Sequence, residues 1–223
     1  MPNYVRNKIV MPGIKHLPLF NEKGDFDFNR IVPMPDPLNI VEGAISDDAI
    51  VVYLTDSGTA LFTDDKASLA KAAGVISPGQ IYSQIKPGAP LNGEALSELF
   101  ALGQRLVENF QKYGARSWYD WCRREWGTKW NACETTVEDD DTVIFDTAWE
   151  PPLPVLAKLS EMYPEVEIEV WCADEAPCEA MLYASIQDGQ VAEDPYDPET
   201  PEGRALYEDL WGFNPKLEDG EDW

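Results

Sequence analysis

Three neighbouring stretches decide the fold: TVIFDTAW at residues 142–149, PPLPVLAKLSEMY at 151–163 and VEIEVWC at 166–172. The first is rich in β-branched and aromatic residues, which favour strands. In the third, valine and isoleucine alternate with glutamate, as in a strand with one apolar and one polar face. The middle stretch begins with prolines, which the first turn of a helix tolerates, and its leucines recur at helical spacing. The order strand, helix, strand predicts an α+β fold.

The sequence on either side adds strands to this unit. Apolar and polar residues alternate over 5–11, which predicts a first strand that ends at Pro12-Gly13. Residues 180–187 predict a further strand, followed by a turn at Asp188-Gly189. If the first strand and the helix expected at 94–113 join the same sheet, the result is a split β-α-β sheet of the ferredoxin-like kind, with its helices on one face.

A long amphipathic helix is the clearest element of the first half. From Glu94 to Tyr113 the apolar residues fall on one helical stripe, Asn92 can cap its start, and Gly114 ends it. The short apolar run 49–54 fits either a strand or a helix, and residues 65–73 are typical of a helix.

The last part of the chain differs from the rest in composition. Residues 193–202 contain three prolines, which exclude a continuous helix or an inner strand and predict an extended connector. Residues 204–211 then predict a short helix. We therefore expect one domain over residues 1–190, with inserted helices around 40–115, and an acidic, proline-rich C-terminal extension over 191–223.

The net charge is carried almost wholly by the second half. The 223 residues have a formal net charge of −24, yet residues 1–130 hold 15 acidic and 14 basic side chains, whereas residues 131–223 hold 26 acidic and 3 basic ones. This excess argues against nucleic-acid binding, which depends on Lys and Arg at the phosphates, and it creates a field that attracts cationic partners. No run of 18 apolar residues predicts a membrane span, and the N-terminus lacks the apolar core of a signal peptide, so we expect a cytoplasmic protein.

Cysteine and histidine are too sparse to indicate a metal site or a disulfide framework. Cys122, Cys133, Cys172 and Cys178 include no C-x-x-C pair, and His16 is the single histidine. We interpret the cysteines as free thiols in a reducing compartment and expect no metal and no cofactor. The sequence lacks the signatures of phosphate-binding loops, serine hydrolases and zinc proteases, although two of its 41 carboxylates could still meet in a cleft.

Half of the eight tryptophans lie between Trp118 and Trp130. We interpret this segment as a core helix with its exit loop; the alternative is an aromatic platform, beside the segment's basic residues, that stacks on a base or a ligand ring. Asp146 lies in an apolar strand and needs a hydrogen-bond partner, for which an indole or Lys129 is a candidate. The candidate ligand site comprises Trp118, Tyr119, Trp121, Arg123, Arg124, Trp126, Lys129, Trp130, Asp146 and Trp149.

The acidic residues of the second half form a candidate partner surface. Residues 138–141 are a run of four carboxylates, but they lack the spaced ligands and the turn glycine of a calcium loop, so we interpret them as a solvated hairpin turn. The candidate surface comprises Glu138, Asp139, Asp140, Asp141, Glu167, Glu169, Asp174, Glu175, Glu193, Asp194, Asp197 and Glu199.

Four groups of residues resemble motifs of the YubB-like proteins of plasmids and phages. They are Asn3-Tyr4-x-x-Asn7, FNxIVPMP at 28–35, WYxW at 118–121 with WGTKW at 126–130, and FDTAWxPP at 145–152. The chain departs from the family pattern at Val5, where a cysteine is expected, and in the loop 173–178. The resemblance implies a ferredoxin-like domain, without an iron–sulfur cluster, and an accessory protein of a mobile element that acts inside a bacterial cell. It implies no particular activity.

Functions from different classes remain open. The leading hypothesis is a non-enzymatic protein that binds a basic host partner through its acidic C-terminal half, in its sharpest form as a nucleic-acid mimic that inhibits a host defence or other nucleic-acid-binding protein. The alternative is a small-ligand or nucleotide-binding enzyme that uses the Trp118–Trp130 segment and Asp146. A structural interaction module without an electrostatic role would bind its partner insensitively to salt. We expect no direct binding to nucleic acid or membranes.

Overall fold

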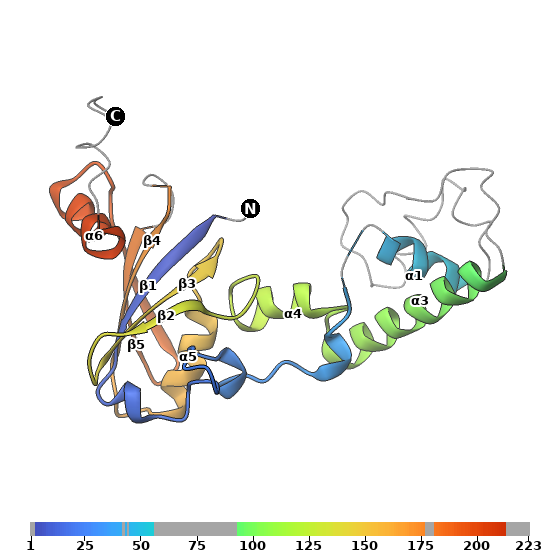
Figure 1. Ribbon diagram of the computed structural model, residues 1–223, viewed down its shortest axis with the longest axis horizontal. Coiled ribbons are helices and arrows are strands. Elements are labelled where there is room, and N and C mark those ends of the chain that lie inside the picture. Colours follow the sequence, from blue (N-terminus) through green and yellow to red (C-terminus); the bar gives the residue numbers. More distant parts are fainter. Residues whose placement is uncertain (1–2, 42, 44, 56–92, 177–180, 213–223) are drawn as a thin grey trace. The chain divides into compact units, whose positions relative to one another are not determined.

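The computed structural model describes residues 3–41, 43, 45–55, 93–176 and 181–212 (Figure 1). The chain divides into two compact units, which we call the sheet unit (Met1–Pro33 and Cys122–Trp223) and the helical unit (Met34–Trp121). The helix expected at 65–73, the cap Asn92, the thiol of Cys178 and the end of the chain from residue 213 lie outside the described residues. None of the described helices is long and apolar enough to cross a lipid bilayer.

Six antiparallel strands form the sheet of the sheet unit, in the order β2-β3-β1-β4-β5-β6. The strands are β1 (Tyr4–Val10), β2 (Cys133–Val137), β3 (Thr142–Ala148), β4 (Ile168–Asp174), β5 (Met181–Gln187) and β6 (Gln190–Pro195). The strands expected near the N-terminus and around the fold-deciding stretches are thus confirmed as β1, β3, β4 and β5. The turn at Asp188-Gly189 is confirmed as well, with both residues at positive φ.

A split β-α-β unit lies at the centre of this sheet. Helix α5 (Leu153–Met162) joins β3 to β4. Both strands pair antiparallel with β1, which lies between them, so β3 and β4 run parallel to each other. This is the α+β, ferredoxin-like arrangement that the sequence predicts. The connecting helix is α5, however, and not the long helix at 94–113, because α5 is the segment directly between the two parallel strands and the long helix belongs to the helical unit.

The alternation of the strands defines two faces of the sheet. Residues that pair directly across two antiparallel strands point to the same face. Ile9 pairs with Val143 and Val170 on the face that α5 covers, the α5 face, whereas Lys8 pairs with Trp171 on the opposite one. Helix α6 (Pro201–Trp211) packs on this second face, which we call the α6 face. Figure 1 shows α5 and α6 on opposite sides of the strands.

The C-terminal segment is part of the sheet unit. Gln190–Pro195, for which the prolines predict only an extended connector, is the edge strand β6. Pro195 stands at the end of this edge strand, where a missing N–H costs little. Helix α6 then buries Leu206, Tyr207 and Leu210. A separate acidic extension is therefore not confirmed, and α5 and α6 do not lie on one face.

The core of the sheet unit is aromatic on the α5 face. Phe145 stacks on Phe26 with 5.1 Å between ring centroids, and Phe28 contacts Trp126 edge-on at 5.7 Å. The indole N–H of Trp126 donates to the carbonyl of Val32 at 2.9 Å. These contacts tie the segment after β1 to the sheet. The short elements are η1 (Ile14–His16), η2 (Phe28–Arg30), η3 (Asp36–Leu38) and α4 (Trp118–Glu125).

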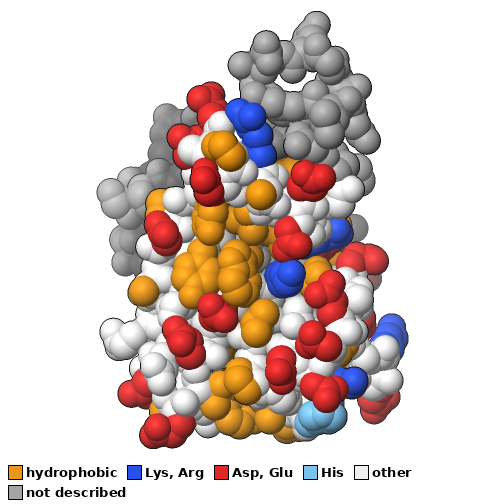
Figure 2. Space-filling view, turned by 90° about the vertical axis from the view of Figure 1, so that its left-hand side faces the viewer, with side chains coloured by type: hydrophobic (Ala, Val, Ile, Leu, Met, Phe, Trp, Pro, Cys, Tyr) orange, Lys and Arg blue, Asp and Glu red, His pale blue; other side chains and the backbone are white. Residues whose placement is uncertain are grey.

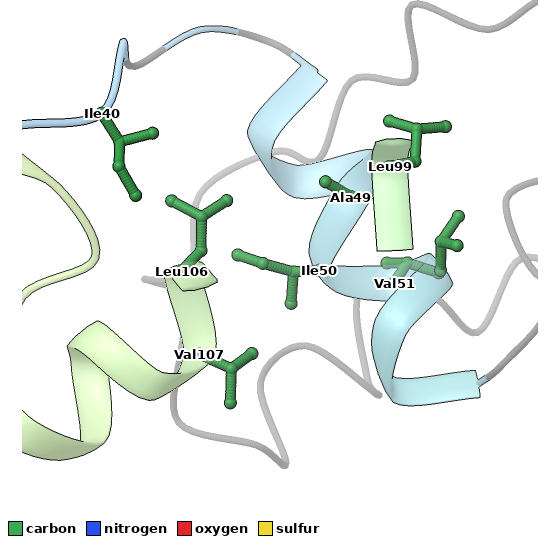
Figure 3. Close-up of a cluster of buried hydrophobic side chains, with 8 residues drawn as sticks. Ile40, Ala49, Ile50, Val51, Leu99, Leu106 and Val107 are labelled. Atoms are coloured by element: carbon green, nitrogen blue, oxygen red, sulfur yellow. The ribbon is translucent and has the colours of Figure 1, made fainter. Parts of the chain in front are cut away.

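The helical unit is built on α1 (Ile45–Thr55) and α3 (Gly93–Tyr113). The long helix is confirmed, and the run 49–54, which fits either a strand or a helix, is helical. A Cβ at Gly103 would lie 2.0 Å from the carbonyl oxygen of Ala49, so the glycine permits the close approach of the two helices. Figure 3 shows the buried cluster between them, which includes Ile40, Ala49, Ile50, Val51, Leu99, Leu106 and Val107.

Candidate partner-binding surface

The tryptophan-rich segment serves mainly as core. Trp121 and Trp126 are 5% and 3% exposed. After α4 the chain turns at Gly127, where φ is +82° and a Cβ would lie 2.4 Å from the ring of Pro154. In the helical unit, Trp118 and Tyr119 pack edge-on against each other at 5.7 Å. This geometry favours the interpretation as a core helix with its exit loop.

The structure brings together one part of the predicted aromatic platform. The ammonium of Lys129 lies 4.9 Å from the ring centroid of Trp130 and 4.3 Å from that of Trp149. Cations bind to the negative face of an indole, so this lysine is held by two rings of its own chain. Arg124 pairs with Glu125 at 2.7 Å, and Arg123 is exposed on α4. A base that stacked on these rings would have to compete with Lys129.

Asp146 binds Arg6, a partner that the sequence analysis does not name. The carboxylate is 6% exposed and accepts from Arg6 Nε at 2.9 Å and from Nη2 at 3.0 Å. The expectation of an indole or Lys129 as its partner is therefore wrong. The hydrogen bonds to Asp146 raise the pKa of Arg6, against the opposing effect of burial.

Arg6 also fastens α6 to the sheet. Its guanidinium lies 4.2 Å from the ring centroid of Trp211 and donates from Nη1 to the carbonyl of Leu210 at 3.3 Å. Asp146, the acidic residue on the apolar strand β3, thus has a structural role: it holds Arg6, which contacts α6. Strand alternation places Arg6 and Asp146 on outward positions of their strands, but only the register between β1 and β3 shows that they meet.

Three members of the predicted acidic surface lie on the α6 face. Glu169 accepts a hydrogen bond from the hydroxyl of Tyr183 at 3.1 Å, and Glu167 accepts one from Ser185. Asp194 pairs directly with Tyr183 across β5 and β6. Burial and the neighbouring Glu169 raise the pKa of Tyr183. The phenol therefore stays protonated and donates its hydrogen bond to Glu169.

The run 138–141 is a hairpin turn between β2 and β3, as predicted, and all four residues are exposed. The carboxylate of Asp141 accepts from the backbone N–H of Gly13 at 2.6 Å, and Asp140 pairs with Lys15 at 3.0 Å. The backbone N–H of Asp141 lowers the pKa of Asp139, and Lys15 lowers that of Asp140. This turn is anchored to the chain after β1.

The remaining acidic residues do not extend the surface into one continuous patch. Asp174 is 2% exposed, and its carboxylate accepts from the N–H of Ala176 at 2.7 Å, so it cannot face a partner. Glu193 pairs with Ala184 and lies on the α5 face. Glu175, Asp197 and Glu199 are exposed in the loops that flank α6. Of the candidate acidic surface, Glu167, Glu169 and Asp194 therefore share the α6 face, and the other members lie elsewhere.

An apolar groove lies on the α6 face, between α6 and the sheet. It has a volume of about 440 Å³ and is lined by Lys8, Val10, Trp171, Tyr196, Glu202, Leu206 and Asp209. The ring of Trp171 lies 5.2 Å from that of Tyr183. Figure 2 shows hydrophobic side chains in the middle of this view, with more Asp and Glu than Lys and Arg around them.

The two cations of β1 on this face are paired with carboxylates. Lys8 binds Asp209 at 3.0 Å, and Arg6 binds Asp146. Glu202 and Asp209, both on α6, were not named by the sequence analysis. The face therefore combines aromatic rings with exposed carboxylates, the chemistry that suits a basic and partly apolar partner. Within the described residues, no three His, Cys, Asp or Glu side chains gather as a metal site.

Comparison with known families identifies the larger part of the sheet unit. Residues 125–214 match the family model described as the ferredoxin-like domain in Api92-like protein. The match runs from the end of α4 to the end of α6, and so it includes β6 and α6 in the domain. It agrees with the ferredoxin-like architecture of this region.

The comparison with solved structures gives a weaker likeness. The crystal structure of a protein api92 from Yersinia pseudotuberculosis shares 12% sequence identity with the chain, with a TM-score of 0.37. The alignment covers 88% of this chain and 98% of that one. No curated protein matches the sequence.

Proposed function

We propose that this chain is a non-enzymatic binding protein that uses the α6 face of its sheet unit to bind a basic partner protein. The observation that carries the proposal is the composition of that face. Exposed carboxylates surround Trp171, Tyr183 and the groove under α6, while the two cations of β1 are neutralised within the fold. Complementary charge guides association, and a half-buried aromatic patch supplies the apolar contact area.

The distribution of charge along the chain supports the same proposal. The sheet unit contains the whole of the acidic stretch 131–223, which holds 26 acidic and 3 basic residues. Self-repulsion among so many carboxylates destabilises a compact state. A cationic partner that bound over the α6 face would relieve part of this repulsion, so binding would also stabilise the fold.

The proposed class of partner is suggested by the sequence resemblance alone. The motifs shared with YubB-like proteins favour an accessory protein of a phage or plasmid that acts in the cytoplasm of a bacterial host. In that setting the basic partner is a host nucleic-acid-binding or defence protein, and the carboxylates of the α6 face take the place of phosphates. This nucleic-acid mimicry is the sharpest form of the proposal.

The test compares two charge-matched variants of the full chain. In the face variant, Glu167→Gln, Glu169→Gln and Asp194→Asn remove three charges from the α6 face. In the control, Glu22→Gln, Glu94→Gln and Glu98→Gln remove three exposed charges elsewhere. Each immobilised protein is incubated with bacterial lysate at low ionic strength and eluted with salt. We expect a basic protein that the wild type and the control retain and that the face variant binds about tenfold more weakly.

Two results would refute the proposal. The first is recovery of no basic protein at low ionic strength. The second is equal loss of binding in both variants, because net charge and not the α6 face would then control the interaction. Elution that does not depend on salt would instead indicate an interaction module without an electrostatic role.

A further inference from the structure

Strand β6 lies at the edge of the sheet, and no described strand pairs with its outer side. All six of its residues, Gln190–Pro195, are exposed. β6 pairs with β5 on one side and is the last strand in the order of the sheet. An edge strand presents unpaired N–H and C=O groups, which can pair with another extended chain.

The register shows which backbone groups of β6 point outward. The N–H of Tyr196 donates to the carbonyl of Met181 at 2.9 Å, which fixes a bonded pair at the end of the ladder. Bonded and non-bonded pairs alternate in an antiparallel ladder, so Asp194, Ala192 and Gln190 bond to β5. The backbone groups of Val191 and Glu193 therefore point away from β5. Pro195, the next outward position, has no N–H.

A hollow lies beside this edge, on the α5 face. It has a volume of about 490 Å³, and its apolar walls come from α5, β5 and β6. The residues that line it are Gly127, Glu150, Pro151, Leu153, Pro154, Ala157, Leu182, Val191 and Glu193. Val191, 36% exposed, stands where the hollow meets the edge. The two carboxylates in the lining belong to Glu150 and Glu193.

We propose that an extended basic segment of the partner adds to β6 as a further strand of the sheet. This inference rests on the proposed function, since it specifies how the basic partner is held. The backbone of the segment bonds to Val191 and Glu193, which gives affinity independent of sequence. Side chains of an added strand alternate, so an apolar residue enters the hollow while the neighbouring Lys or Arg points to the α6 face, where Asp194 lies.

The negative charge of the chain favours a basic segment, and not a second copy of this chain, as the strand that pairs with β6. Two copies joined at β6 would bring together two chains of net charge −24. Acidic side chains on an edge strand discourage pairing between like copies, and here Glu193 and Asp194 occupy neighbouring positions. The same side chains favour a strand that carries Lys or Arg, because opposite charges across a strand pair are stabilising.

Two labelled peptides of equal charge and length test the inference with the intact protein. One alternates lysine with valine over about eight residues, a common strand length. The other has the same sequence with a methyl group on every peptide nitrogen, so it has no backbone N–H to donate to a ladder. We expect the Lys–Val peptide to bind, and the methylated peptide to bind about tenfold more weakly, because it lacks the backbone donors. In the Val191→Pro variant this preference should become smaller, since one of the two outward N–H groups of β6 is removed.

Hydrogen exchange of the wild-type protein provides a readout that needs no variant. On addition of the Lys–Val peptide, the amides of Val191 and Glu193 should become protected, while those of Ala192 and Asp194, already bonded to β5, should change little. Equal binding of the two peptides, or no new protection at Val191 and Glu193, would overturn the strand addition. The proposed binding role of the α6 face would be unaffected by this result, because it is tested separately by the face variant and its charge-matched control. A change in oligomeric state of Val191→Pro in the absence of peptide would assign the edge to a second copy, and would also overturn the inference.

Discussion

The two faces of the sheet carry different kinds of side chain. On the α5 face, apolar side chains such as Ile9, Phe145 and Val170 are completely buried. On the α6 face the corresponding positions hold charged and half-buried aromatic residues, among them Arg6 and Trp171. The α5 face supplies the apolar burial that holds a fold together, whereas the α6 face keeps groups that cost energy to bury. Such a division indicates that burial on the α5 face stabilises the fold, and it agrees with the binding role proposed for the α6 face.

The largest expected effect on stability comes from a substitution in the core of the α5 face. Phe145→Ala removes a ring that contacts both Phe26 and Phe28, and it should lower the free energy of unfolding by about 3–5 kcal/mol. Ile144→Ala, one residue away but half-buried on the α6 face, should cost only about 1 kcal/mol. Urea unfolding of both variants measures the difference. Equal losses would contradict the division between the two faces.

A smaller effect is expected from the polar contact that fastens α6. Asp146→Ala leaves Arg6, whose side chain is 28% exposed, without its carboxylate partner and should cost about 2 kcal/mol. Arg6→Ala removes the contacts with Trp211 and Leu210 as well. The double variant should lose less stability than the sum of the two single variants, because the pair is broken only once.

The control for this cycle is Lys8→Ala, which breaks the pair with the exposed Asp209 and should cost less than 1 kcal/mol. If the loss of unfolding free energy in the double variant equalled the sum of the losses in Arg6→Ala and Asp146→Ala, the two side chains would not act as a pair. Hydrogen exchange of α6 should rise in Asp146→Ala more than that of α5, since α6 is the element the pair holds.

Local patterns predicted most strands and helices but not how they assemble. Residues 142–148 and 168–174 were read correctly because β-branched residues and strict alternation are local signals. β6 was missed as a strand because proline argues against inner strands and says less about edges. The run 49–54 remained ambiguous because a short, uniformly apolar segment shows no periodicity.

The candidate surface could be predicted only in part. Glu167 and Glu169 follow from alternation, which places them opposite the buried residues of β4. The groove under α6 could not be inferred, because Lys8, Trp171 and Leu206 come from three distant elements. The pair of Arg6 and Asp146 depends on the register of β1 against β3, which no single strand encodes. Long-range pairing is thus the information that the local pattern lacks.

The smallest expected effect is a pH dependence that differs between two cysteines, one on each face. Cys172 on the α5 face is fully buried, and burial raises the pKa of its thiol. Cys133 pairs with Asp146 on the α6 face and is half-buried, so its pKa is raised by weaker burial together with nearby carboxylates. In the unfolded chain both thiols ionise near pH ~8.5. The folded state therefore holds these protons more tightly, and its stability should fall as the pH rises above about 8.5.

Comparison of Cys172→Ala with Cys133→Ala measures this difference. Urea unfolding at several pH values from neutral to alkaline should show a decline for the wild type, which Cys172→Ala reduces more than Cys133→Ala does. Cys122, whose pKa burial raises to about 12, contributes to the decline in all three proteins and so cancels in the comparison. Equal slopes for the two variants would mean that the α5 face is no drier than the α6 face. In that case the division of the sheet into a stabilising face and a recognition face would lose its physical basis.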